Sequence, residues 1–184
     1  MPTMTGQHVM LREYRQDDYP HIRKWVNDRN TSQYLSAIFW FPQTEADTTD
    51  FLNRAMRAAP NAAYFVIADI KDESYIGQLD LFEINWKTRV GKIGTVIGSE
   101  DKRGKGYGSE AMKLMLDYAF GILGLERVEL EVYAENKRAV RCYEKAGFVY
   151  EGTRRHAAMV NGKHADVNMM SVLKADWENS IKAQ

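Results

Sequence analysis

The fold is decided by one stretch of the sequence, Arg103-Gly104-Lys105-Gly106-Tyr107-Gly108-Ser109-Glu110-Ala111. Glycine occupies every second position from Gly104 to Gly108, and a residue without a Cβ lets the backbone turn tightly and approach a ligand closely. Apolar residues at helical spacing follow as far as Phe120, so the glycines open a helix. Free N–H groups at a helix start, together with the positive end of the helix dipole, bind phosphate. The stretch therefore predicts a site for a phosphorylated ligand.

Two common phosphate-binding motifs do not fit this stretch. The Walker motif requires G-x-x-x-x-G-K-[ST], but the sixth position counted from Gly98 is Arg103, and Lys105 is followed by Gly106. The dinucleotide fingerprint requires G-x-G-x-x-G, and Ser109 stands where its third glycine belongs. These mismatches disfavour a nucleoside-triphosphate enzyme. A glycine-rich turn without a ligand stays open as the alternative.

Two motifs resemble those of a known family. Arg103, Gly106 and Gly108 form R-x-x-G-x-G, which resembles the acetyl-CoA loop of the GNAT acetyltransferase superfamily. The segment 136–148 resembles that family's N-x-x-A-x-x-x-Y-x-x-x-G-F motif, and a strand-like run separates the two motifs. The resemblance extends from about Val9 to about Trp177. It points to the branch of ribosomal-protein N-terminal acetyltransferases and bacterial spermidine acetyltransferases.

The pattern of the chain predicts a strand, two helices, three strands, a helix, a strand, a helix and a hairpin. We expect strands over 9–14, 63–70, 75–84, 92–97, 127–133, 150–160 and 163–173, and helices after Asp17-Asp18, from about 42–45, over 106–120 and after Asn136. A crossover helix should bring 127–133 parallel to 92–97. The fold class is therefore α/β, with a mixed sheet of the α+β kind. The GNAT resemblance implies a central, mostly antiparallel sheet, a splayed parallel strand pair and about four flanking helices.

Smaller features complete this picture. Asn136 is expected to cap its helix and Gly147 to end it, and Asn161-Gly162 suits a tight two-residue hairpin turn. The helix over 106–120 should stop at Gly121 or Gly124. We expect the helix that starts near Pro42 to bury Phe51, Leu52, Ala55 and Met56.

Composition suits one domain over residues 1–184. The chain is 45% hydrophobic and 27% charged, with a formal net charge of zero, which gives no reason to expect nucleic acid or an anionic membrane as partner. Its apolar runs are too short for a membrane span, and residues 1–7 lack the apolar core of a signal peptide. The single cysteine, Cys142, excludes an intrachain disulfide. We expect a cytoplasmic protein that needs no metal.

The GNAT resemblance implies acetyl-CoA as co-substrate. Its diphosphate should meet the amides and cations of residues 103–109, and its extended pantetheine arm should pair with the edge of the strand 94–98. Asn136 matches the family's asparagine that hydrogen-bonds the cofactor. The cofactor-binding residues predicted in this way are Thr95, Val96, Ile97, Arg103, Gly104, Lys105, Gly106, Tyr107, Gly108, Ser109 and Asn136.

Acetyl transfer to an amine expels a thiolate, which a general acid can protonate. Tyr143 matches the tyrosine of the second motif, and the resemblance gives it this role; the alternative is a packed helix aromatic beside Ala139 and Val140. A tyrosine with its ordinary pKa of about 10 is protonated at neutral pH. We interpret Cys142 as a buried thiol, because an acyl-cysteine mechanism needs a histidine that the sequence does not place nearby.

The base that accepts the proton of the attacking ammonium is less well marked. Glu83 is the first candidate, because family members often place a carboxylate in this region. Asp80 on the same strand, and His156 and His164 on the terminal hairpin, are further candidates. Each of the four could equally be a surface or structural residue.

The acceptor should be a primary amine, and the region before Ala63 usually shapes its pocket in this family. Aromatic and acidic residues there could receive a cation, or they could form the hydrophobic staple and negative first turn of an ordinary helix. These residues are Tyr34, Phe39, Trp40, Phe41, Pro42, Glu45, Asp47 and Asp50.

The leading hypothesis is an acetyl-CoA-dependent N-acetyltransferase that acts on a polyamine or another small amine. A protein N-terminus is the second acceptor, and an antibiotic amine stays open as a third. A CoA-binding sensor without catalysis is the alternative from another class, and the presence of Tyr143 disfavours it. Members of the family are often dimers, and the spermidine branch can be larger, so the resemblance is compatible with a homo-oligomer.

Overall fold

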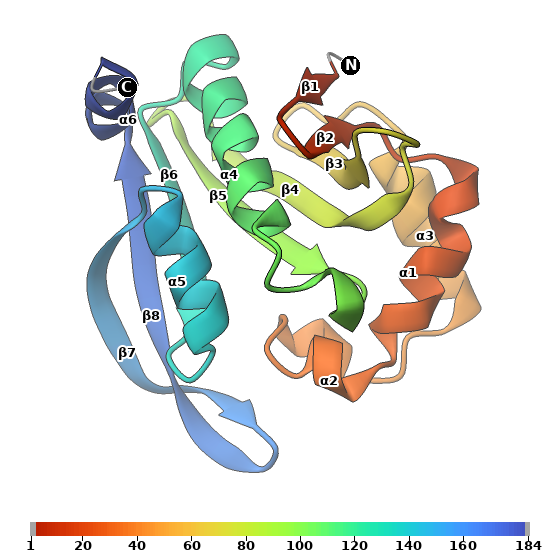
Figure 1. The fold of residues 1–184 in the computed structure, drawn as a ribbon. Coiled ribbons are helices and arrows are strands. Elements are labelled where there is room, and N and C mark those ends of the chain that lie inside the picture. The colour runs from red at the N-terminus through yellow and green to blue at the C-terminus, as the bar shows by residue number, and fades with distance from the viewer. Residues whose placement is uncertain (1–2, 183–184) are drawn as a thin grey trace.

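The computed structural model describes residues 3–182, so the first two and the last two residues of the expected domain 1–184 lie outside it. Within that range the strands form one sheet in the order β1-β2-β3-β4-β5-β6-β8-β7 (Figure 1). Every neighbouring pair is antiparallel except β5 and β6. The predicted mixed, mostly antiparallel sheet with one parallel pair is confirmed. The strands are β1 Met4–Thr5, β2 Val9–Arg12, β3 Ala63–Asp69, β4 Tyr75–Asn85, β5 Val90–Ile97, β6 Arg127–Tyr133, β7 Val149–Val160 and β8 Lys163–Leu173.

Helices cover both faces of the sheet (Figure 1). They are α1 Tyr19–Val26, α2 Arg29–Ser32, α3 Glu45–Ala55, α4 Tyr107–Leu116, α5 Lys137–Lys145 and α6 Lys174–Lys182. The sequence did not predict α2 or α6. The first is a single turn of four polar residues, and the second has no buried residue, so neither shows the apolar periodicity that marks a helix.

Two apolar cores lie on opposite faces of the sheet. Strand β3 contributes Phe65 and Ile67 to the core beneath α4 and α5, and Val66 and Ala68 to the core beneath α1 and α3. This follows from the two-residue period of a strand. It also explains why 63–70 is a continuous apolar run rather than an alternating one.

The parallel pair opens into a split. Strands β5 and β6 are in register only from Val90–Lys92 opposite Arg127–Glu129. Beyond that point β6 continues to pair with β8 as far as Tyr133, and β5 continues to pair with β4 as far as Ile97. The edge of β5 that faces β6 is therefore open from Ile93 onward, which is the splay that the GNAT resemblance implied.

Several local predictions are confirmed. The Asn136 side chain accepts a hydrogen bond from Ala139 N–H at 3.2 Å and caps α5, and Gly147 follows this helix with φ of +99°. Asn161 and Gly162 have φ of +51° and +78°, as a tight hairpin turn between β7 and β8 requires.

Two local predictions are wrong. Asp18 does not cap α1, because its carboxylate binds the Arg12 guanidinium at 2.8 and 2.9 Å. Met56 is 41% exposed, because α3 ends at Ala55 and the chain turns away from the core. Of the two stops predicted for the helix over 106–120, Gly124 is confirmed: the chain passes Gly121 in a π turn, in which Leu123 N–H donates to Tyr118 O, and Gly124 follows in the left-handed region.

No helix within residues 3–182 has the length and apolar character that crossing a membrane requires.

Candidate active site

The glycine-rich stretch forms a turn between β5 and α4 that leaves main-chain donors free. Gly104 and Gly106 have φ of +75° and +88°, a region that other residues rarely adopt, and Gly106 is the N-cap of α4. Glu110 N–H makes the first hydrogen bond of the helix, to Gly106 O at 3.0 Å. The N–H groups of residues 104–109 have no hydrogen-bond partner in the part of the chain that the structure describes. This turn therefore offers a row of unused donors at the positive end of a helix.

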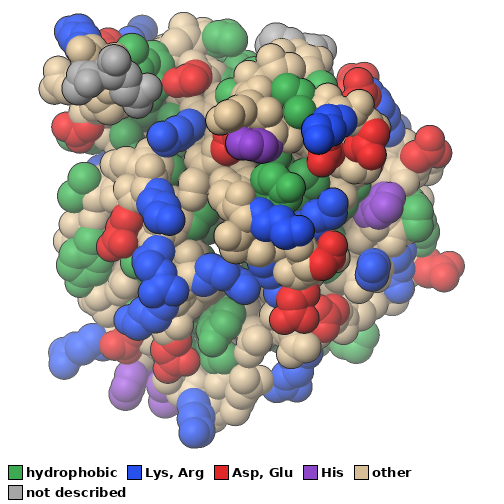
Figure 2. All heavy atoms as spheres, in the orientation of Figure 1, with side chains coloured by type: hydrophobic (Ala, Val, Ile, Leu, Met, Phe, Trp, Pro, Cys, Tyr) green, Lys and Arg blue, Asp and Glu red, His purple; other side chains and the backbone are tan. Residues whose placement is uncertain are grey.

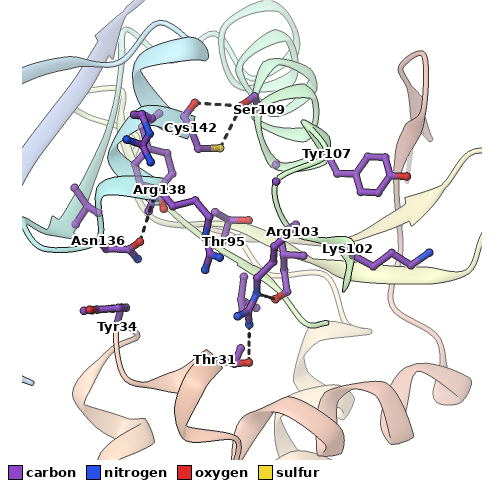
Figure 3. Close-up of a pocket in the computed structure, with 18 of the residues that line it drawn as sticks. Thr31, Tyr34, Thr95, Lys102, Arg103, Tyr107, Ser109, Asn136, Arg138 and Cys142 are labelled. Atoms are coloured by element: carbon purple, nitrogen blue, oxygen red, sulfur yellow. Dashed lines mark hydrogen bonds between the residues drawn. The ribbon is translucent and has the colours of Figure 1, made fainter. Parts of the chain in front are cut away.

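A cavity of about 440 Å³ lies in front of this turn and reaches into the split between β5 and β6 (Figure 3). Its volume falls in the range of small-molecule sites. The turn, the end of β5, the outer half of β6, α5 and the segment around α2 form its walls. The predicted residues that the structure brings to it are Thr95, Val96, Ile97, Arg103, Gly104, Gly106, Tyr107, Gly108, Ser109, Asn136 and Tyr143.

Two predicted cofactor residues fit this arrangement only in part. Lys105 does not line the cavity. Tyr107 lines it, but its ring points away from Asn136 and Arg138 in Figure 3. Both residues belong to the turn through their backbone, and their side chains contribute little to the walls.

The walls of the cavity are strongly basic. Figure 2 shows Lys and Arg side chains gathered over α5 and the turn that precedes α4. Glu131 is the single carboxylate among the residues that line the cavity, against five cations. The three cations on α5 were not predicted from the sequence, although spacings of three and four residues place them on one helix face. The five are Lys102, Arg103, Arg138, Arg141 and Lys145.

Arg103 is held by the protein. Its Nε donates to Ile97 O at 3.2 Å, and its Nη2 donates to Thr31 Oγ1 at 2.6 Å (Figure 3). Burial, and next the neighbouring Arg138, lower the pKa of the Arg103 guanidinium. The side chain thus joins the end of β5 to α2.

The open edge of β5 presents main-chain groups to the cavity. Gly98 N–H donates to Ile76 O on the β4 side at 3.0 Å. Because backbone groups alternate sides along a strand, those of Thr95 and Ile97 point to the open edge. Arg103 already occupies Ile97 O, so Thr95 supplies a free donor and acceptor pair there.

Tyr143 lies at the wall of the cavity with an uncommitted hydroxyl. The residue is 8% exposed and packs against Phe148, with ring centroids 5.9 Å apart. The Tyr143 hydroxyl has no hydrogen-bond partner among the described residues. Every buried side-chain N or O atom of these residues has a partner, so the Tyr143 hydroxyl oxygen is not fully buried and is open to solvent. Burial raises the pKa of Tyr143 above its usual value, so the hydroxyl stays protonated at neutral pH.

Asn136 is placed to serve both its helix and a ligand. Its side-chain oxygen caps α5, and its amide nitrogen has no hydrogen-bond partner in the region 3–182. The group therefore keeps both of its N–H donors available on the cavity side.

Cys142 is half-buried and lines the cavity, where the sequence analysis expected a buried thiol. The Ser109 hydroxyl donates to its Sγ at 3.3 Å, and burial raises the pKa of the thiol. None of the residues that line the cavity is a histidine. A Cβ added to Gly108 would lie 3.2 Å from this Sγ, so packing of α4 against α5 already favours glycine there.

The candidate bases lie outside the cavity. The Glu83 side chain is 62% exposed and its carboxylate binds Lys92 Nζ at 2.7 Å. Asp80 accepts a hydrogen bond from the Tyr14 hydroxyl at 3.2 Å, and burial raises the pKa of Asp80 to about 7. His156 and His164 stack on each other at 4.8 Å on the terminal hairpin.

The predicted acceptor region divides between two cavities. Tyr34 lines the first cavity, and Phe39, Trp40, Phe41 and Pro42 line a second one of about 670 Å³ that reaches the β7–β8 turn. The acidic residues line neither cavity. Asp47 forms a capping box with Thr44, and Glu45 lies in the first turn of α3, so the ordinary helix-start interpretation accounts for these two; Asp50 is exposed one turn further along the helix.

The described residues contain no group of three or more His, Cys, Asp or Glu side chains arranged to hold a metal ion.

A family model described as an acetyltransferase (GNAT) domain matches residues 8–149. The chain belongs to the GNAT acetyltransferase family. The resemblance inferred from the two motifs is thereby confirmed.

Individual members of the GNAT family match along most of the chain. A spermidine N(1)-acetyltransferase of Vibrio cholerae is 32% identical over 176 residues, which covers 95% of this chain and 98% of that protein. A crystal structure of spermidine N-acetyltransferase from Vibrio cholerae in complex with CoA and spermine superimposes with a TM-score of 0.81 at 30% identity, and covers 93% and 98% of the two chains. A putative ribosomal N-acetyltransferase of Bacillus subtilis is 35% identical over 107 residues, or 58% of each protein.

Proposed function

We propose that this GNAT acetyltransferase transfers the acetyl group of acetyl-CoA to a primary amine of a polyamine or another small amine. One observation carries the proposal: the unused N–H groups of residues 104–109 face a basic cavity at the split of β5 and β6. The arrangement of one continuous sheet around this split supports a single catalytic domain over residues 1–184.

The residues present suit the diphosphate and the pantetheine arm of acetyl-CoA. The amides of 104–109 suit the diphosphate, and Arg138 and Arg141 add positive charge on the opposite wall. Thr95 at the open edge of β5 offers the N–H and C=O that an amide of the pantetheine arm needs. The free amide nitrogen of Asn136 suits a carbonyl acceptor of the same arm.

The reaction balances with one acid and one base. The amine nitrogen attacks the thioester carbon, a C–N bond forms, and the C–S bond breaks to leave a thiolate. Before the attack, the ammonium loses one proton to a carboxylate, which passes it to solvent. Tyr143 donates its hydroxyl proton to the sulfur, and the proton that the nitrogen loses as the amide forms restores the Tyr143 hydroxyl through solvent. The free hydroxyl of Tyr143 at the cavity wall supports this assignment.

For the base we favour Asp80 over the first candidate, Glu83. A base works best with a pKa near the working pH, and burial raises the pKa of Asp80 to about 7. Asp80 on β4 is also the register partner of Gly94 on β5, and Gly94 precedes Thr95, the residue proposed to bind the pantetheine arm. Glu83 is exposed and already bound to Lys92, which leaves it less suited to accept a proton.

The relatives support the polyamine acceptor, because two spermidine acetyltransferase matches cover at least 90% of both chains. The match to a ribosomal N-acetyltransferase keeps a protein N-terminus as the alternative. A noncatalytic CoA sensor is disfavoured by the uncommitted hydroxyl of Tyr143.

The single cysteine tests the cofactor assignment without a mutation. Cys142 lines the cavity, so a maleimide should modify it in the free protein, and saturating acetyl-CoA should slow that reaction at least tenfold. ATP and NAD at the same concentration serve as controls and should have little effect. An unchanged rate with acetyl-CoA, or equal protection by ATP, contradicts the proposal.

An acceptor screen tests the substrate class. We would measure thiol release from acetyl-CoA with spermidine, with amino-terminal peptides and with aminoglycosides, and subtract the one equivalent that Cys142 itself contributes. We expect spermidine to give the highest kcat/KM. Preference for a peptide would favour the ribosomal alternative, and no release with any acceptor would favour the sensor.

A further inference from the structure

The segment 28–35, which contains α2, separates the two cavities. Asn30, Thr31, Tyr34 and Leu35 line the cofactor cavity. Arg29, Ser32 and Gln33 line the second, aromatic cavity. A short segment thus forms a wall that both cavities share, and the position of this wall sets the shape of both.

Tyr34 packs on Tyr133 and Leu35 packs on the core, and hydrogen bonds connect this wall to three other parts of the chain. Arg103, at the start of the glycine-rich turn between β5 and α4, donates to Thr31 Oγ1 at 2.6 Å. The Tyr133 hydroxyl at the end of β6 donates to Leu35 O at 3.2 Å. Arg29 donates from Nε and Nη2 to Asn161 Oδ1 in the β7–β8 turn at 3.0 and 2.8 Å.

The hydrogen bond to Thr31 is the shortest of the three connections. The Thr31 hydroxyl donates to Asp28 Oδ2 at 2.5 Å and accepts from Arg103, so both of its hydrogen-bonding roles are fixed. Asp28 in turn caps α2 by accepting from Asn30 N–H. Thr31 is only 8% exposed, and the Nε of Arg103 donates to Ile97 O. These hydrogen bonds connect α2 to the end of β5.

We infer that Arg103 is a positioning residue that holds the segment 28–35 in place through Thr31, and that cofactor binding thereby organises the acceptor side of the enzyme. Arg103 begins the turn whose amides receive the diphosphate, so a bound diphosphate fixes the turn, and the turn fixes the wall. Binding energies of the two substrates are then coupled, and the coupling is reciprocal. The inference rests on the proposed function, because it requires CoA to bind at the turn.

The alternative is that Arg103 acts by its charge as a direct ligand of the phosphates. The two roles predict different effects of substitutions at Arg103 and Thr31. A charge role is preserved in Arg103→Lys and untouched in Thr31→Val. A positioning role is lost in both variants, because a lysine has a single ammonium group in place of the Nε and Nη2 donors and valine has no hydroxyl. Thr31→Ser keeps the hydroxyl and therefore the positioning role.

Amide hydrogen exchange with and without coenzyme A separates these possibilities. In the wild type and in Thr31→Ser, coenzyme A should slow exchange at least fivefold both in the turn 104–109 and in the segment 28–35. In Thr31→Val and Arg103→Lys, protection of 104–109 should remain, and the added protection of 28–35 should be lost. Exchange in β3 without ligand reports whether each variant is folded.

Kinetics with spermidine give a second readout. We expect Thr31→Val to raise the KM for spermidine at least fivefold with kcat changed less than twofold, and Thr31→Ser to restore the KM. Full protection of 28–35 in Thr31→Val, or none in the wild type while 104–109 is protected, overturns the positioning role alone. Absence of protection at 104–109 in the wild type overturns the proposed function itself.

Discussion

Replacing Gly106 with alanine separates the cost to the fold from the cost to cofactor binding. Gly106 has φ of +88° and ψ of −10° at the start of α4. A residue with a Cβ pays about 1–2 kcal/mol in this left-handed region. The added Cβ meets no protein atom within 4 Å, so no clash adds to that cost. For a domain of this size each kcal/mol lowers Tm by about 2–4 °C, so we expect a Tm lower by about 2–8 °C and a folded protein.

The effect on acetyl-CoA should be larger than the effect on the fold. Gly106 lines the cavity and belongs to the turn at which the diphosphate is proposed to lie, so an added methyl group takes up space beside the ligand. We expect Kd to rise at least tenfold, which corresponds to about 1.4 kcal/mol. At a concentration about 100 times the wild-type Kd, acetyl-CoA should stabilise the wild type by about 2.7 kcal/mol and the variant by about 1.4 kcal/mol. The ligand-induced rise in Tm should therefore fall by about half.

Thermal unfolding with and without acetyl-CoA measures both effects, and Gly124→Ala is the matched control. Gly124 has φ of +66°, its nearest neighbour to an added Cβ is Arg89 Nη1 at 4.0 Å, and it does not line the cofactor cavity. The control should lose similar stability and keep the full ligand-induced shift. A full shift in Gly106→Ala as well would refute the placement of the diphosphate at this turn.

Three further predictions concern the chemistry of the site. Tyr143→Phe should lower kcat at least tenfold with acetyl-CoA affinity within twofold in steady-state and binding measurements, and an unchanged kcat would remove Tyr143 from the mechanism. The logarithm of kcat/KM should rise with pH to a plateau above about pH 7, where Asp80 is ionised; Asp80→Asn should abolish this rise and Glu83→Gln should keep it, and the reverse pattern would make Glu83 the base. Because the pKa of Asp80 is raised to about 7 in the folded protein from 3.8, its contribution to stability is lost as pH rises through that interval. Denaturant unfolding of Asp80→Asn should therefore show stability increasing relative to the wild type between about pH 4 and pH 7, and a constant difference would mean that the carboxyl is solvated.

The regular elements could be predicted because their signals are local. Alternation in 127–133 and the Asn161-Gly162 pair fix a strand and a hairpin from neighbouring residues alone. The glycine-rich turn was equally predictable, because Gly104 and Gly106 adopt backbone angles that other residues avoid. In these places the sequence pattern and the three-dimensional requirement coincide.

The walls of the cavity could not be predicted in the same way. The bond between Arg103 and Thr31 joins residues 72 positions apart, and α2 carries no apolar period that announces it. Whether Glu83 or Asp80 suits the role of base depends on burial and on the bulge between Phe82 and Asn85, and these arise from packing of the sheet. The split of β5 from β6 entered only through the family resemblance, since spacing does not show where two paired strands part.

A crystal structure of the protein with coenzyme A tests the central claim most directly. The account predicts diphosphate oxygens within about 3.2 Å of several main-chain nitrogens of residues 104–109, with the thiol end toward Tyr143. A diphosphate bound elsewhere, while these nitrogens contact only water, would contradict it.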